Sequence, residues 1–402
     1  MVLSIKTLFS YVLIVGTTMS LFTSLRFSFF GLGELLIIFT FFLTNFKKIP
    51  IFNLQNYPFT IFWVIYIFSA LIGSLFNLAF INNQTGSLEK LSIDLFAYIF
   101  ILATSFTLEA NINLKAINPW NILKGFILFS SSILTLLLVI SFFTDGFFGL
   151  KLMYEKNFAP MVDNVHQIAM FYILLPFLCL GIYLKEIEIN PKKNNFVRFV
   201  TYFSLLSATA YMAITATATK SIIGFWLGVI CLIFFYLISK SGSILRSLFI
   251  YLLFVLIALL FFYLDLYSMF IKFFTEADVD GGRAYFYGTA INLFSESPVF
   301  GRGPGGHIWM GQQYWDVHQT FLTILVQAGV IGFVSFLLLL MRFLKDIFKE
   351  SIFLASMVPL LIYALGGDIL RRLPVWILII LLMYAIKYVR SNDASDSSNL
   401  IT

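Results

Sequence analysis

The chain has 402 residues, of which 60% are hydrophobic and only 11% are charged. A water-soluble surface needs more charge than this, so the composition excludes an ordinary soluble globular protein and indicates that most of the surface faces lipid. The formal net charge of +6 is also typical of nucleic-acid-binding proteins, but here the basic residues gather in short loops between apolar runs, which argues against that class.

Apolar runs of about 20 residues recur along the whole chain, and each is long enough to cross a bilayer as a helix. The first run is followed directly by more membrane-length sequence, so we interpret it as a span and not as a cleavable signal peptide. We predict an all-α integral membrane protein with about twelve transmembrane helices, at 8–25, 27–46, 59–80, 91–108, 122–143, 166–184, 197–219, 221–238, 247–264, 319–341, 352–366 and 373–389.

The distribution of charge predicts the topology. Most of the 26 basic residues fall on one side of the membrane, in short loops and in the two tails, if the N-terminus is cytoplasmic. The positive-inside rule therefore predicts that both termini are cytoplasmic and that the long loop at 265–318 faces outward, into the periplasm of a cell with two membranes. We expect one polytopic membrane domain at 1–390 and a disordered polar tail at 391–402.

The loop at 265–318 carries its own pattern. Residues 283–296 have helical spacing, with Gly281 and Gly282 before them and Ser297 and Pro298 after them. The following GRGPGG at 301–306 is too rich in Gly and Pro for regular structure. We interpret the glycines of the stretch 281–332, including these, as the hinge of a lid over the membrane surface. The GRGPGG segment matches neither a P-loop nor a dinucleotide fingerprint.

Two isolated cations are candidates for binding an anion. Arg283 begins the predicted helix, where a guanidinium could clamp a phosphate; the alternative is a solvated residue or a lipid headgroup contact. Lys220 lies between two apolar runs with no acidic neighbour, and ionisable residues near membrane depth are functional hypotheses by default. Its alternative interpretation is a lysine that snorkels to the interface.

Histidine chemistry is concentrated at the outer mouth of the span at 319–341. His318, two residues after Asp316, could act as a general base or as a cation for an anionic ligand; the alternative is an interfacial histidine bonded to backbone. His307, in the glycine-rich loop, and Arg302 are weaker candidates for binding substrate. The spacing of these residues does not fit a metal site, and Cys179 and Cys231 lie inside apolar runs, so we predict no metal.

The loop between the last two predicted spans reads GGDILRRLP and contains Asp368, Arg371 and Arg372. An internal ion pair that stabilises the bundle and a role in the reaction are equally good interpretations of this group. We count Asp368 and Arg372 as candidate substrate-binding residues.

Taken together, these motifs resemble those of the O-antigen ligase and polymerase superfamily. The resemblance rests on the arginine-bearing helix, an SP-x-x-G-x-G motif at 297–303, an H-[NQ]-x-x-L motif at 318–322, a GxxG at 329–332, and a T-x-[ST]-R junction at 217–220. It covers about 210–335. Lysine replaces the usual arginine at 220 and glutamine replaces the usual asparagine at 319, which changes the geometry at 220 while keeping its charge.

The resemblance implies a GT-C-like fold and an inner-membrane glycosyltransferase that uses neither a metal nor another cofactor. The implied donor is a glycan on undecaprenyl pyrophosphate, and the implied acceptor is a hydroxyl of the lipid A–core saccharide. Arg283 and Lys220 would stabilise the pyrophosphate leaving group, and His318 would be either the base or a third cation. Asp368 after two glycines resembles the acid of the ligases and favours a ligase.

Two alternatives remain open at the level of sequence. A polymerase of the same superfamily would use the same donor but extend another lipid-linked glycan. A transporter of lipid-linked glycans is a different class, but transporters commonly show two related halves with polar residues at midplane, whereas the charges here concentrate at the outer surface of the second half.

Overall fold

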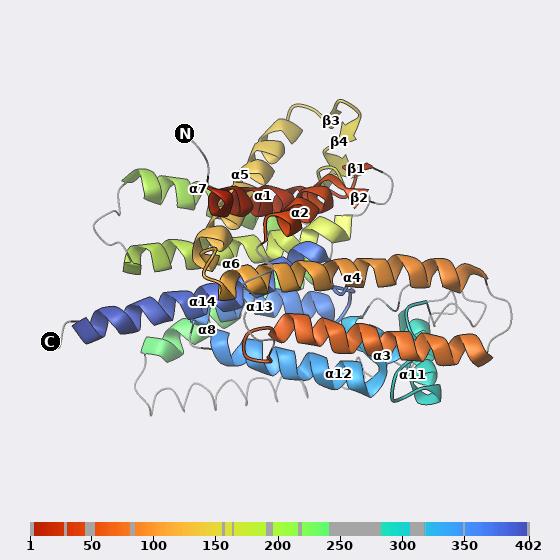
Figure 1. Ribbon diagram of the computed structural model, residues 1–402. Helices are drawn as coiled ribbons and strands as arrows, with labels where there is room; N and C mark the ends of the chain where they lie inside the picture. The colour runs from red at the N-terminus through yellow and green to blue at the C-terminus, as the bar shows by residue number, and fades with distance from the viewer. Residues whose placement is uncertain are drawn as a thin grey trace, which may run out of the picture.

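The computed structural model (Figure 1) describes residues 4–27, 30–44, 53–80, 85–154, 157–162, 165–189, 196–215, 219–240, 283–305, 317, 319–348 and 350–399. Helices make up most of this part of the chain: α1 (Ile5–Met19), α2 (Leu32–Phe42), α3 (Pro58–Phe80), α4 (Thr85–Asn113), α5 (Pro119–Ser141), α6 (Val165–Ile189), α7 (Phe196–Thr215), α8 (Thr219–Lys240), α11 (Arg283–Glu296), α12 (Thr320–Ile347), α13 (Ser351–Ala364) and α14 (Leu373–Asn399).

Extended structure in the described residues is limited to three two-stranded antiparallel ribbons. These pair β1 (Arg26–Phe27) with β2 (Phe30–Gly31), β3 (Gly146–Phe147) with β4 (Leu150–Lys151), and β5 (Met153–Tyr154) with β6 (Asn157–Phe158). The first ribbon connects α1 to α2, and the other two connect α5 to α6.

The predicted all-α membrane fold is confirmed. Within the described residues, 7 helices are long and apolar enough to cross a membrane, and the shorter apolar helices are Ile5–Met19, Leu32–Phe42, Ile222–Tyr236 and Ser351–Ala364. Each predicted span coincides with one of these helices, except 247–264, which lies outside the described residues. Several are shorter than predicted because turns interrupt the apolar runs; α13, for example, ends before Gly366 and Gly367.

The bundle is built by helices that are neighbours in space but distant in sequence. α3 lies along α12, α13 lies between α8 and α6, and α14 packs on α5 and α4 (Figure 1). Aromatic rings fill the centre: Trp63 of α3 stands edge-on to Trp376 of α14 at 4.8 Å and stacks on Tyr98 of α4 at 5.5 Å. All three side chains are buried, so this cluster fixes α3, α4 and α14 against one another.

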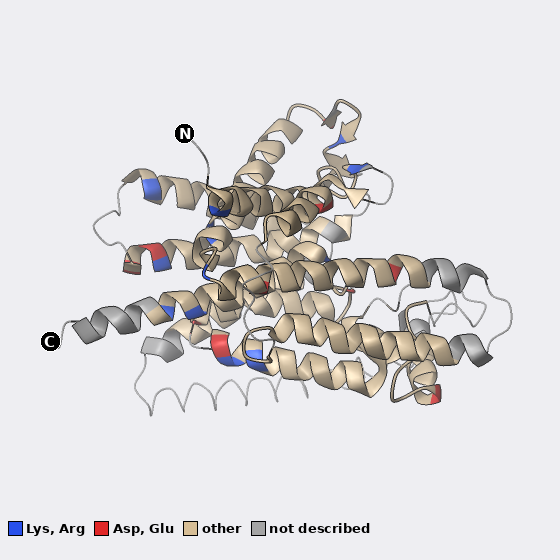
Figure 2. Ribbon diagram, in the orientation of Figure 1, with Lys and Arg blue, Asp and Glu red and all other residues tan. Residues whose placement is uncertain are grey.

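The charged residues distinguish one end of the bundle from the other. At one end, Glu186 pairs with Lys124 and Arg198, and Glu350 pairs with Lys185 and Arg390. Figure 2 shows the basic residues of α7, α12 and α14 toward this end, where α14 leads to the C-terminus. It is the end that the positive-inside rule predicts to be cytoplasmic.

Helix α14 extends further than the hydropathy predicts. It continues to Asn399, into the segment 391–402 whose polar composition predicts disorder. Adding a residue to an existing helix costs far less than starting one, so a polar segment can continue a helix that it would not nucleate.

Candidate functional site

The central feature of the site is a break in the membrane-spanning helix α12. Gly329 has φ 60° and ψ −160°, a conformation incompatible with a continuous helix. Because no water is available inside a bilayer, the backbone groups released by such a break need partners within the protein. Here they are provided by the segment 297–303, which follows α11.

Backbone hydrogen bonds join this segment to both halves of α12. Arg302 and Gly303 donate their N–H groups to the carbonyl oxygens of Val326 and Gln327, at 2.6 and 3.0 Å. On the other side of the break, the N–H of Val330 donates to the carbonyl of Pro298 at 2.8 Å. The SP-x-x-G-x-G motif therefore replaces hydrogen bonds that the broken helix cannot make itself.

The glycines of this motif allow two backbones to touch. Gly301 and Gly303 have φ of +69° and +74°, and a Cβ atom on Gly301 would lie 2.6 Å from the carbonyl oxygen of Val326. From the other side, a Cβ on Gly73 of α3 would lie 2.5 Å from the carbonyl oxygen of Gly301. The interpretation of these two glycines as a lid hinge is wrong: the segment is wedged between α3 and α12, where only glycine fits.

Side chains of α3 and α4 provide further hydrogen bonds to the residues at the break. Ser69 donates its hydroxyl to the carbonyl oxygen of Ala328 at 2.8 Å. The amide oxygen of Gln327, whose side chain is 3% exposed, accepts from the hydroxyls of Tyr66 and Tyr98 at 2.8 and 2.7 Å. A buried amide with such partners is fixed in place, so these hydrogen bonds hold the break in α12 in one conformation.

Helix α11 lies against α12 beside the break. It packs on α12 through Tyr287, Ala290 and Leu293, which form a small core with Val317 and Val326. The predicted bounds 283–296 are confirmed. The predicted catalytic Arg283 is the first residue of α11, and its side chain is outside the part of the structure that is described.

Arg302 is the predicted site residue closest to the break. Its guanidinium forms an ion pair with Glu296 at the end of α11, which links the helix to the wedged segment. Burial lowers the pKa of Arg302. A guanidinium nevertheless remains protonated in proteins, so Arg302 keeps its positive charge beside α12.

The beginning of α12 explains the H-[NQ]-x-x-L motif. Gln319 is the N-cap, and its side-chain oxygen accepts the N–H of Leu322 at 2.5 Å. Asparagine, the usual residue here in the resembling family, is also a strong N-cap, so either amide can start the helix. His318 and His307 lie outside the described residues, but His318 directly precedes this capped start.

Thr320 ties the start of α12 to the loop that carries the predicted acid. Its hydroxyl donates to the carbonyl oxygen of Gly367 at 2.9 Å and accepts the N–H of Ile369 at 3.2 Å. Asp368 therefore lies beside the start of α12, and its carboxylate accepts the N–H of Leu370 at 2.9 Å.

The remaining cations of this loop lie at the same end of the bundle. Arg371 donates from Nη1 to Oδ1 of Asp94 in α4 at 2.9 Å. Arg372 begins the turn into α14, and both Arg372 and Asp368 lie within electrostatic range of the Tyr363 hydroxyl of α13. The structure thus brings predicted residues from the last loop close to the start of α12.

Lys220 is the second residue of α8, and its side chain lies outside the described residues. Helix α8 packs on α13, with Gly224 opposite Pro359. The two helices run in opposite directions, so α8 from Gly224 back to Lys220 leads toward the end of α13 at Ala364, where the 366–372 loop begins. This backbone path is compatible with a shared site.

Asp94 is a residue that the sequence analysis missed. It lies at the head of the apolar helix at 91–113 and is 1% exposed. The available signal was an acid inside an apolar run, which is costly unless it is paired. Its partner Arg371 is 277 positions away, and no local pattern could identify the pair.

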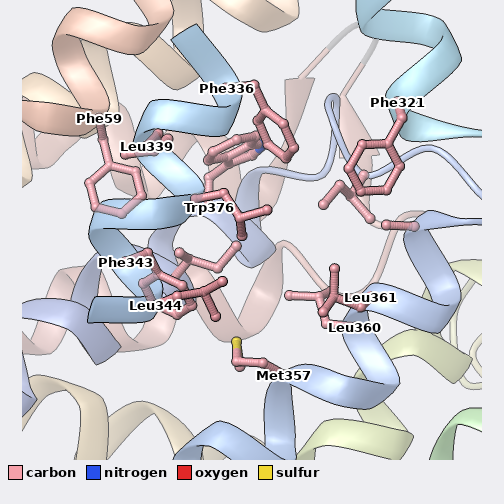
Figure 3. A pocket seen from close by; sticks show the side chains of 14 residues that line it. Phe59, Phe321, Phe336, Leu339, Phe343, Leu344, Met357, Leu360, Leu361 and Trp376 are labelled. Atoms are coloured by element: carbon pink, nitrogen blue, oxygen red, sulfur yellow. The ribbon is translucent and has the colours of Figure 1, made fainter. Parts of the chain in front are cut away.

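An apolar pocket extends inward from this polar end (Figure 3). Its empty volume is about 610 Å³, including the part that is open to the surroundings. The lining comes from α3, α12, α13, α14 and the 366–372 loop, and consists of Phe59, Phe321, Phe336, Leu339, Leu340, Phe343, Leu344, Met357, Leu360, Leu361, Ala364, Ile369, Trp376 and Ile379.

The α12 side of the pocket includes residues from both sides of the break at Gly329. Phe321 and Ile369 lie at its polar end, and Phe343 and Leu344 lie near the other end of α12. The break at Gly329 changes the direction of α12, so the ring of Phe321 lies 5.8 Å from that of Phe336. Beyond this contact, at about 1.5 Å per residue, α12 lines the pocket for roughly 12 Å, from Phe336 to Leu344. Because Ile369 of the 366–372 loop is part of the lining, the polar loop and the apolar pocket are continuous.

Comparison with known families gives a match over part of the chain. Residues 203–337 match the family model described as O-antigen ligase. The match includes Lys220, Arg283, Arg302 and the break in α12, and it agrees with the region from which the resemblance was drawn. It does not include Asp94 or the 366–372 loop. No curated protein matches the chain.

Proposed function

We propose that this multi-pass membrane protein is an O-antigen ligase, and the match of residues 203–337 to the O-antigen ligase family model supports the proposal. It transfers a glycan from undecaprenyl pyrophosphate to a hydroxyl of the lipid A–core saccharide, on the periplasmic face of the bacterial inner membrane. Both termini then lie in the cytoplasm.

The observation that carries the proposal is the junction of a polar loop with an apolar pocket. Ile369 lines the pocket and is hydrogen-bonded to Thr320, which follows His318 and Gln319 at the start of α12. A substrate with a long apolar tail and an anionic head matches this arrangement. The tail would lie along α12 and the head would lie among Asp368, Arg371 and Arg372.

The chemistry follows from the charges of the site. In a direct displacement, the acceptor oxygen bonds to the anomeric carbon while the bond from that carbon to the pyrophosphate oxygen breaks. The hydroxyl proton passes to His318, and the pyrophosphate leaves with the electrons of the broken bond. Arg283 and Lys220 stabilise the charge that develops on the leaving group, so a metal is not required.

Inversion at the anomeric carbon is expected from this single displacement. A double displacement would need a carboxylate nucleophile about 5 Å from a second carboxylate across the reacting bond. The candidate residues are instead mostly cations, which suit a phosphate leaving group.

A deletion strain complemented with variants tests the proposal. Loss of a ligase leaves full-length polymer on the lipid carrier, whereas loss of a polymerase leaves single repeat units attached to core. We expect Arg283→Ala and His318→Ala each to give the ligase phenotype at normal protein levels. Lipopolysaccharide capped as in wild type, in both variants, would contradict the site assignment.

A further inference from the structure

We propose that Arg371 is an anion-binding residue of the transfer site, that it binds a phosphate oxygen of a lipid-borne substrate, and that Asp94 is the residue that positions it. This inference rests on the proposed function. It extends the site into two segments, α4 and the 366–372 loop, that the family match does not cover.

The first observation is the unequal burial of the two partners. The side chain of Asp94 is 1% exposed, while that of Arg371 is 27% exposed. The carboxylate therefore belongs to the interior, and the guanidinium reaches from it toward the end of the bundle. The buried Asp94 thus fixes the side chain of Arg371, and part of the guanidinium is exposed at the end of the bundle.

The second observation concerns the cost of the pair. An ion pair placed among apolar helices gains little stability over an apolar pair of the same volume, because both charges lose their hydration. Ionisable residues at membrane depth are accordingly rare and are concentrated at functional sites. The free energy of folding alone gives no reason for Asp94 and Arg371 to be charged.

The third observation is that the backbone on both sides of Arg371 is hydrogen-bonded; after it, the N–H of Arg372 donates to the carbonyl of Ile369 at 3.0 Å. Before it, Ile369 and Leu370 donate their N–H groups to Thr320 and Asp368. The carbonyl of Leu370 also accepts from the indole of the buried Trp376 at 3.0 Å. With the backbone fixed by these bonds and the side chain fixed by Asp94, the guanidinium is held in place before substrate arrives, which is what electrostatic catalysis requires.

The fourth observation links the pair to the α12 break. Tyr98 lies one helical turn after Asp94 on α4 and donates to Gln327, the amide at the break. Asp94 and Arg371 also lie within electrostatic range of Tyr98. The same face of α4 thus holds both the break and the cation.

The position of Arg371 identifies the class of ligand. It lies two residues after Ile369, which lines the polar end of the apolar pocket. A guanidinium offers planar paired donors that match phosphate oxygens. The phosphate is either the pyrophosphate of the donor or a phosphate of the acceptor core, and the two are separated by measuring each substrate in turn.

The test uses the full-length protein in lipid nanodiscs, with wild type, Arg371→Gln, Asp94→Asn and the double variant D94N/R371Q. The double variant keeps a hydrogen bond between the two side chains and removes both charges. As a matched control, the Lys387–Asp346 ion pair at the opposite end of the bundle, 2.9 Å long, is neutralised as D346N/K387Q.

We expect Arg371→Gln to raise the KM of one substrate by on the order of tenfold to a hundredfold, as for the loss of a hydrogen bond to a charged group. Asp94→Asn should raise the same KM less. The double variant should regain the melting temperature of wild type but not its KM, and the control pair should change neither KM. A raised donor KM assigns the pyrophosphate, and a raised acceptor KM assigns the core phosphate.

A purely structural pair gives the opposite result: the double variant would recover transfer together with stability, and the proposal would be overturned. Ligand-induced increases in melting temperature with undecaprenyl pyrophosphate and with phosphorylated lipid A–core measure binding without transfer. If wild type binds but does not transfer, the proposed function fails while this inference is still decided: loss of either binding in Arg371→Gln supports it, and retention of both refutes it.

Discussion

Gly329→Ala is the substitution that most directly tests how the α12 break is held together. A Cβ at this position would lie closer than 3.0 Å to the backbone of Val299 and of Gly301, which cannot rotate away as a side chain can. The combination of φ 60° and ψ −160° is one that essentially only glycine adopts, and it adds a cost of about 1–3 kcal/mol for a residue with a Cβ.

Relief of the clash requires the 297–303 segment to move away from α12. This movement would break the bonds from Arg302 to Val326 and from Val330 to Pro298, each worth about 1 kcal/mol. The total destabilisation is therefore about 3–5 kcal/mol. We expect a decrease of roughly 5 °C or more in the melting temperature of the protein in nanodiscs, and loss of transfer.

Gly288→Ala is the matched control, since a Cβ on this glycine of α11 meets no atom within 4 Å. Alanine also favours the helix by up to about 1 kcal/mol. The control should melt at or above the temperature of wild type and should retain transfer. Equal melting temperatures and equal activities for the two alanine variants would refute the account of the break.

Three further changes probe the charge, the helix start and the pocket. Lys220→Arg should retain transfer if the position supplies only positive charge, and an inactive variant in the transfer assay would show that the geometry is specific to lysine. Gln319→Asn should melt like wild type, whereas Gln319→Ala should lose about 1 kcal/mol of stability with its cap; equal melting would contradict the capping role. Leu360→Trp should fill the pocket and raise the KM of a long-tailed donor, while the exposed Leu338→Trp should not; equal KM values would contradict a lipid site there.

Features set by local sequence were predictable. Hydropathy over about 20 residues identifies a span because a membrane imposes that length. The bounds of α11 followed from residues that cannot continue a helix: Gly281 and Gly282 before it, and Ser297 and Pro298 after it. These signals are read within a few positions.

Features that depend on distant contacts were not predictable. Gly329 in an apolar helix looks like a packing glycine until the 297–303 segment is seen beside it. In the sequence alone, Gly301 and Gly303 suggest a mobile loop, because their contacts with α3 and α12 come from distant parts of the chain. The role of Asp94 is apparent only from the fold, which places Arg371 against it.

The central claim is that the protein joins a lipid-borne glycan to a core saccharide. The most direct measurement supplies the purified protein with a defined undecaprenyl-pyrophosphate glycan and lipid A–core, and follows both lipids by mass spectrometry. We predict a product that carries the glycan on the core, together with free undecaprenyl pyrophosphate. Elongated lipid-linked glycan with unmodified core would identify a polymerase, and movement of intact donor across the bilayer without any new bond would identify a transporter; either result would contradict the account.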